Sequence, residues 1–176
     1  HEVKNKRDII PKKPIIFLMV GGNNKRYNPQ NYDYYDLGMK VAHAAKLLNA
    51  RLIISTSRRT DRKAEKVLKS TFTKQLNNFE LYGFNDKNPY PEILKTANYL
   101  IVTSDSVNMV SETATISTPL FISYFRKEDG KILNFLENLK DLRIIKKFEG
   151  TLFNFNKNNL NTNAETILKI NNFFSS

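Results

Sequence analysis

The stretch ANYLIVTSDSVNMVSE, residues 97–112, joins an unbroken apolar run at 99–103 to a polar turn and a segment with helical spacing. Unbroken apolar strands are typical of parallel sheets, because such strands are buried on both faces. The turn that follows is rich in Ser and Asp, the residues that cap helix starts. This stretch therefore predicts a buried strand that ends in a polar turn and leads into a helix.

The same alternation recurs along most of the chain. Strand and helix repeated about four times predicts an α/β fold: a doubly wound, Rossmann-like parallel sheet covered on both faces. We expect residues 1–14 to be an N-terminal linker or extension and residues 15–176 to be the α/β domain. The expected strands are 15–20, 51–55, 79–82, 99–103 and 119–123, and the expected helices are 34–49, 62–76, 91–96, 107–116, 128–138 and 164–173.

Composition narrows the function classes. The chain has 176 residues, which suits one domain, and no apolar run approaches the length of a membrane-spanning helix. There is no cysteine and there are only two histidines, so we expect no disulfide, no metal site and no cofactor. The net charge of +11 points to an anionic partner, although abundant Lys, Asn, Ile and Phe throughout the chain explain the charge equally well.

Ligands in open parallel sheets bind at the carboxyl ends of the strands, so the loops there hold the candidate site. The first strand runs into Gly21-Gly22-Asn23, where two glycines allow the backbone to approach a phosphate. The alternative is a tight strand-to-helix turn. Neither a G-x-G-x-x-G fingerprint nor a G-x-x-x-x-G-K-[ST] loop is present, which argues against a nicotinamide enzyme and a P-loop ATPase.

The second strand runs into a loop that contains Ser57, Arg58 and Arg59. Arginine binds phosphate through two parallel hydrogen bonds, so the pair predicts an oxyanion clamp. The alternative is a solvated basic loop.

The turn and helix after the fourth expected strand form the most specific candidate. Ser106 is placed to cap the helix, and the free N–H groups of a first helical turn attract phosphate. A carboxylate one to two turns further on, at Glu112, is positioned for ribose hydroxyls; the alternative is a capped helix with an exposed acid. Asp105 is the one local acid that we propose as a catalytic base. The candidate ligand-binding residues in this segment are Ser104, Asp105, Ser106, Met109, Ser111 and Glu112.

Several stretches together resemble the mitochondrial-fission "elongated mitochondria" proteins and their bacterial relatives. These proteins are described as glycosyltransferases and are sometimes labelled nucleoside-diphosphate-sugar epimerases. The stretches are VGGNNKRY (20–27), STSRRT (55–60), NPY (88–90), TSDSVNMVSE (103–112), FEG (148–150) and LNTNAETI (160–167). One departure is Ser117-Thr118, where relatives often have a glycine.

The resemblance implies the C-terminal half of a GT-B-type glycosyltransferase, whose N-terminal acceptor domain is absent from this chain. It places Ser57, Arg58 and Arg59 near the diphosphate, Glu112 on the ribose, and Gly21 and Gly22 at the cleft between domains. The partners implied are a nucleoside-diphosphate sugar, the N-terminal domain of the same protein and a peripheral membrane or lipid-linked acceptor.

Three functions remain open: a transferase, an epimerase of the same fold, and a non-catalytic protein-interaction module. We expect this chain alone to be inactive, because one half of a GT-B protein lacks the closed cleft between domains. We expect no nucleic-acid binding, because aromatic and basic residues are not organised as a stacking platform. The expected location is cytoplasmic, at the inner face of the membrane.

Overall fold

The computed structural model describes residues 12–126 and 128–160. Six parallel strands form one sheet in the order β3-β2-β1-β4-β5-β6. The strands are β1 (Ile15–Val20), β2 (Arg51–Thr56), β3 (Glu80–Tyr82), β4 (Tyr99–Thr103), β5 (Leu120–Ser123) and β6 (Lys146–Lys147). The Rossmann-like fold predicted from the alternation is confirmed.

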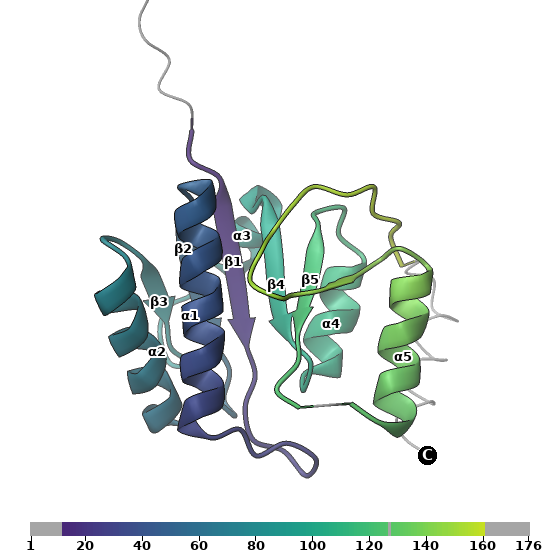
Figure 1. The fold of residues 1–176 in the computed structure, drawn as a ribbon, viewed down its shortest axis with the longest axis horizontal. Helices are drawn as coiled ribbons and strands as arrows, with labels where there is room; N and C mark the ends of the chain where they lie inside the picture. Colours follow the sequence, from purple (N-terminus) through teal and green to yellow (C-terminus); the bar gives the residue numbers. More distant parts are fainter. Residues whose placement is uncertain (1–11, 127, 161–176) are drawn as a thin grey trace, which may run out of the picture.

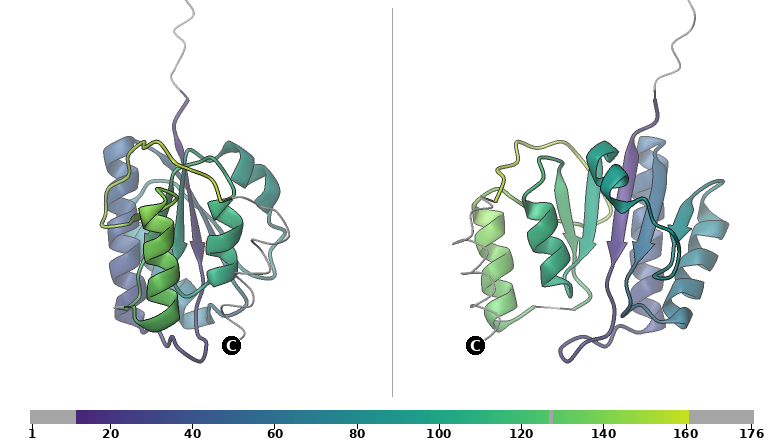
Figure 2. Two further views of the ribbon diagram at one scale, coloured as in Figure 1. Left: turned by 90° about the vertical axis from the view of Figure 1, so that its right-hand side faces the viewer. Right: turned by 180° about the vertical axis from the view of Figure 1, so that it is seen from behind.

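Five helices connect these strands. They are α1 (Asn31–Leu48), α2 (Arg62–Gln75), α3 (Tyr90–Thr96), α4 (Val107–Ala114) and α5 (Gly130–Asp141). Helices α1 and α2 cover one face of the sheet, and α3 and α4 cover the other (Figures 1 and 2). The buried residues of α5 join the α3–α4 face at the β5–β6 end of the sheet.

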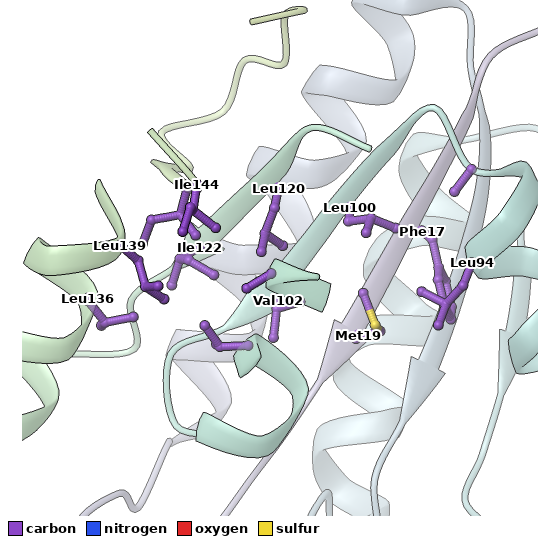
Figure 3. Packing of buried hydrophobic residues seen from close by; sticks show 14 of the residues in the cluster. Phe17, Met19, Leu94, Leu100, Val102, Leu120, Ile122, Leu136, Leu139 and Ile144 are labelled. Atoms are coloured by element: carbon purple, nitrogen blue, oxygen red, sulfur yellow. The ribbon is translucent and has the colours of Figure 1, made fainter. Parts of the chain in front are cut away.

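Strand residues alternate between two apolar clusters. Phe17, Val102 and Ile122 face α3, α4 and α5, as Figure 3 shows for this cluster. Leu18, Ile101 and Phe121 face the opposite side, toward α1 and α2. Nearly every residue of β1 and β4 is buried, which explains why both strands read as unbroken apolar runs.

Several element boundaries differ from expectation. Helix α5 begins at Gly130 and not at residue 128, because Asp129 takes the N-cap position and Glu128 turns into the protein interior. Strand β6 was not predicted: its two residues are lysines, and it is a strand because its backbone pairs with β5. The expected helix 164–173 lies outside the described residues.

The segment after β6 has no helix or strand through residue 160, as predicted for the asparagine-rich tail. It packs back onto the sheet through Phe153 and Phe155, whose rings meet Phe121 edge-on at centroid distances of 5.3 and 5.7 Å. Among the described helices, none has the length and apolar character needed to cross a membrane.

The strand order fixes where a ligand site should lie. The crossover from β1 leads outward to β2, whereas the crossover from β4 leads the other way to β5. The loops after β1 and β4 therefore separate at the carboxyl edge, and this switch point is the usual ligand crevice of a doubly wound sheet. Both loops lie at the lower end of the sheet in Figure 1, where the strand arrows point.

Candidate functional site at the carboxyl edge

Three loops meet at the switch point and are joined by hydrogen bonds. The backbone N–H of Gly21 donates to Thr103 Oγ1 at 2.8 Å, and that of Gly22 donates to Asp105 Oδ2 at 2.9 Å. From the loop after β2, the Thr60 hydroxyl donates to the Gly21 carbonyl. The loops after β1, β2 and β4 therefore behave as one structural unit.

Glycine is required at both positions because other protein atoms fill the space of a side chain. A Cβ on Gly21 would lie 2.6 Å from the carboxyl carbon of Asp105. A Cβ on Gly22 would overlap the backbone carbonyl of Arg59 and lie 2.7 Å from the nitrogen of Thr60. The observed role of the glycine pair is thus close packing of loop against loop.

Asp105 is the centre of this unit. Its side chain is fully buried, and Oδ2 accepts from Arg59 Nη2 at 2.9 Å as well as from Gly22. Burial raises the pKa of the Asp105 carboxyl, and the hydrogen bonds and the Arg59 guanidinium oppose that rise. In this conformation the carboxyl is enclosed, so its proposed use as a catalytic base remains a prediction that requires the loop to open.

The two adjacent arginines have different environments. Arg59 turns inward and also donates from Nη1 to the Gly22 carbonyl at 3.0 Å. Arg58 is exposed, with its guanidinium carbon 5.6 Å from the ring centroid of Phe84, which follows β3. In this conformation only Arg58 is free of Asp105 and Gly22, so the joint clamp expected from the sequence stays a prediction.

The rest of this loop is held locally. Thr60 Oγ1 accepts from the Ser57 N–H at 3.0 Å, and the Ser57 hydroxyl accepts from the Arg59 N–H at 3.3 Å. The N–H of Asn23 donates to the Arg59 carbonyl at 3.1 Å, while the Asn23 side chain is exposed. Ser57 and Asn23 thus shape the loops around Arg59.

The start of α4 remains open. Ser106 occupies the N-cap position, as predicted, but its side chain makes no capping hydrogen bond. Within the described residues, no acceptor takes the N–H groups of Val107, Asn108 or Met109. Unsatisfied N–H groups at a helix start carry partial positive charge and suit an anion.

Glu112 is exposed and lies in the second turn of α4. Its Oε2 accepts a hydrogen bond from the Tyr90 hydroxyl at 3.3 Å. Tyr90, at the start of α3, also packs edge-on to Phe17 and donates to the Met19 sulfur at 3.6 Å. Burial and Glu112 raise the pKa of the Tyr90 hydroxyl. The NPY stretch therefore supplies a site residue that the sequence interpretation did not assign.

Other predicted residues lie on the protein side of the crevice. Ser104 is buried, and its hydroxyl donates to Glu128 Oε1 at 2.8 Å. Met109 is partly buried against the α3–α4 cluster. The Ser111 hydroxyl is buried without a hydrogen-bond partner among the described residues.

A second buried acid, Glu128, was not among the predicted site residues, because the sequence interpretation made it the first residue of the expected helix 128–138. It lies beside Tyr27, whose pKa is raised by burial and by Glu128. Asn24 connects this region to the β4 loop, since its Nδ2 donates to the Asp105 carbonyl at 3.3 Å. The sequence signal that could have indicated Glu128 is its position in a polar segment after an apolar strand. Its hydrogen-bond partner, Ser104, could not be read from the sequence, because it lies on another loop.

Two concave surfaces lie near the ends of β5 and β6. A cavity of about 660 Å³ lies between α1, the loop after β5 and α5, and its lining mixes acids with bases. A second, of about 520 Å³, lies around β6 and the following segment. Neither of these two cavities is lined by Gly21, Arg59 or Asp105.

Comparison with known structures supports the class of fold. The chain resembles MurG of Acinetobacter baumannii with a TM-score of 0.51 and 14% identity, covering 94% of this chain and 41% of that one. AviGT4, a glycosyltransferase involved in avilamycin A biosynthesis, matches with a TM-score of 0.46 and 11% identity over 80% of this chain and 39% of that one. The likeness to MurG extends over nearly the whole chain and supports the Rossmann-like fold.

The particular family follows from the sequence. Residues 2–171 match the family described as Mitochondrial fission ELM1, and the chain belongs to that family. It is also 31% identical over 147 residues to the uncharacterised protein RP120 of Rickettsia prowazekii (strain Madrid E). That match covers 80% of this chain and 40% of RP120, so the chain spans less than half the length of this relative.

Proposed function

We propose that this chain is the donor-binding domain of a glycosyltransferase-like protein, and that it binds a nucleoside-diphosphate sugar at the switch point. The observation that carries the proposal is the open start of α4, where three N–H groups have no acceptor among the described residues and lie on the same helix as the exposed carboxylate of Glu112. A helix start attracts phosphate, and a carboxylate accepts hydrogen bonds from ribose hydroxyls.

Each nearby group has a distinct part in the proposed site. The α4 N–H groups and the Ser106 hydroxyl bind the diphosphate, and the exposed guanidinium of Arg58 supplies a positive charge. Glu112 binds the ribose, and the Tyr90 hydroxyl holds the Glu112 carboxylate in place. Arg59, Gly21 and Gly22 contribute by shaping the crevice, because their polar groups already have protein partners.

The test is calorimetric titration of the chain with UDP-, GDP-, ADP-, CMP- and TDP-linked sugars. Removing a charged hydrogen-bond partner costs about 1.5–3 kcal/mol, so Glu112→Ala and Arg58→Ala should each weaken binding roughly 10- to 100-fold. Glu92→Ala on α3 is the control for Glu112→Ala, and Arg62→Ala on α2 is the control for Arg58→Ala, because each removes an exposed charge of the same sign. Equal binding by all five proteins would contradict the proposed site.

A non-catalytic interaction module is the second candidate. It is favoured by one observation: the Gly21 and Gly22 N–H groups and the Arg59 guanidinium are all bonded within the protein. This candidate predicts that no sugar nucleotide binds the folded chain. If one does bind, product analysis of the longer protein distinguishes transfer to an acceptor from epimerisation of the sugar.

A further inference from the structure

The cavity of about 520 Å³ around β6 has a lining unlike that of the carboxyl edge. Four of its residues are basic (Lys140, Arg143, Lys146 and Lys147) and one, Glu149, is acidic. Two phenylalanines, Phe153 and Phe155, complete the apolar part of the wall. We call these residues, together with the neighbouring exposed Leu142, the basic–aromatic patch.

Two of the cations have no ion pair within the part of the chain that the structure describes. Two of the four cations are in ion pairs: Lys147 Nζ lies 3.7 Å from Glu149 Oε1, and Lys140 Nζ lies 3.9 Å from Glu137 Oε2 on α5. Arg143 and Lys146 form no ion pair with any described residue. The Lys146 ammonium lies 5.7 and 5.2 Å from the ring centroids of Phe153 and Phe155, so the aromatic rings keep it within the patch.

The patch also exposes large apolar side chains. Leu142 is 55% exposed and Phe153 is 47% exposed. Leu142 ends α5, and Asn158 fixes this end by bonding the carbonyls of Leu142 and Arg143. Apolar side chains on a soluble surface beside uncompensated cations are the combination that inserts at a bilayer interface while the cations meet anionic headgroups.

A soluble polyanion fits the patch less well. Binding of single-stranded nucleic acid would require free aromatic faces on which bases stack. Lys146 lies over the rings of both phenylalanines, and both rings also pack edge-on against Phe121. A phosphate-only ligand would leave Leu142 and Phe153 in water.

The position of the patch is compatible with the proposed donor site. Lys146 pairs with Phe121 near the amino end of β5, away from the strand ends that form the switch point. In Figure 1 the segment after β6 and the end of α5 lie in the upper half of the picture, whereas the loops of the carboxyl edge lie at the bottom. A surface bound at the patch leaves that edge accessible.

We infer that the basic–aromatic patch docks the protein on an anionic phospholipid surface, with Arg143 and Lys146 at the headgroups and Leu142 and Phe153 in the interface. This inference does not depend on the proposed donor site. Each cation near such a surface strengthens binding by about fivefold. Reversing two charges should therefore weaken vesicle binding by well over tenfold.

The experiment measures co-sedimentation of the chain with vesicles of phosphatidylcholine alone and of phosphatidylcholine mixed with phosphatidylglycerol. Binding to the mixed vesicles and its loss in Arg143→Glu/Lys146→Glu would support the inference. Lys66→Glu/Lys69→Glu on the exposed side of α2 makes the same change in net charge and should bind nearly as well as the unchanged chain. Equal losses in the two variants would mean general charge attraction and would overturn the inference.

A fluorescence experiment tests whether the apolar side chains of the patch enter the lipid interface. The chain has no tryptophan, so Leu142→Trp introduces a single reporter at an exposed position. Its emission should shift to shorter wavelength with anionic vesicles and should not shift with inorganic phosphate. A single-stranded RNA oligonucleotide that binds the patch while vesicles do not would also overturn the inference, and thermal melting confirms that each variant is folded.

Discussion

Gly22→Ala tests the packing of the three loops at the carboxyl edge. The added Cβ would overlap the Arg59 carbonyl and lie 2.7 Å from the Thr60 nitrogen. Both are backbone atoms, so no side-chain rotation relieves the contact. The loop that carries Gly22 must therefore move away from the loop that carries Arg59.

The size of the effect follows from two opposing terms. Overpacking a well-packed region costs typically about 1–3 kcal/mol, and a rigid backbone contact lies at the upper end. Replacing glycine by alanine recovers about 0.4–1 kcal/mol from the unfolded chain. The expected net loss is about 2 kcal/mol, which lowers the melting temperature of a chain of this size by roughly 4–8 °C.

The assay is thermal unfolding followed by circular dichroism, with Gly83→Ala as the matched control. A Cβ on Gly83 would meet only carboxylate oxygens of Asp86 and Glu65, each at 3.3 Å, and both side chains can shift. Gly83→Ala should therefore melt within about 2 °C of the unchanged chain, since surface substitutions change stability by about 0.5 kcal/mol at most. If Gly22→Ala melts no lower than Gly83→Ala, the loops are not packed as described.

Four further predictions concern three side chains. Asp105→Asn keeps an acceptor for the Gly22 N–H and should cost less stability than Asp105→Ala. The alanine variant leaves the Gly22 N–H without an acceptor and Arg59 without its ion pair, and it should cost about 2 kcal/mol in urea unfolding. Because burial raises the pKa of Asp105, the native state binds more protons than the unfolded state above pH 3.8. The unchanged chain should therefore lose stability relative to Asp105→Asn as the pH rises above 3.8, and parallel pH profiles of the two proteins would refute the raised pKa. Lys157 donates to the Thr113 and Ile116 carbonyls at the end of α4, and burial lowers its pKa to about 8. The unfolded state therefore binds more protons than the native state between pH 8 and 10.5, so the stability of the unchanged chain relative to Lys157→Met should rise across that range. A stability difference that does not change with pH would refute the lowered pKa. Tyr90→Phe should weaken sugar-nucleotide binding severalfold in calorimetry with little change in melting temperature, and unchanged affinity would remove Tyr90 from the site.

The apolar strands made most of the fold predictable. Residues 15–20 and 99–103 are buried on both faces, so their composition alone identifies parallel strands. Strand β6 could not be predicted in this way, because two lysines form it through backbone pairing at the sheet edge. The burial of Glu128 before α5 could not be predicted from the sequence either, because its carboxylate is bonded to Ser104 on another loop.

The site was predictable as a set of loops but not as a set of side-chain directions. Parallel strands bring their carboxyl ends to one edge, so the loops after β1, β2 and β4 had to meet. Nothing in the local sequence separates Arg58 from Arg59, yet one is exposed and the other is paired with Asp105. That difference arises from the contact between Gly22 and the Arg59 backbone.

The most direct test of the donor site is to map where a sugar nucleotide binds, by following backbone amide signals of the isotope-labelled chain during titration. The proposed site predicts the largest shifts at the N–H groups of Val107, Asn108 and Met109, with smaller changes at Gly21 and Gly22, which are already bonded. Shifts concentrated around β6, or no saturable shifts in a folded sample with any of the five nucleotide classes, would contradict the assignment of the α4 start as the donor site.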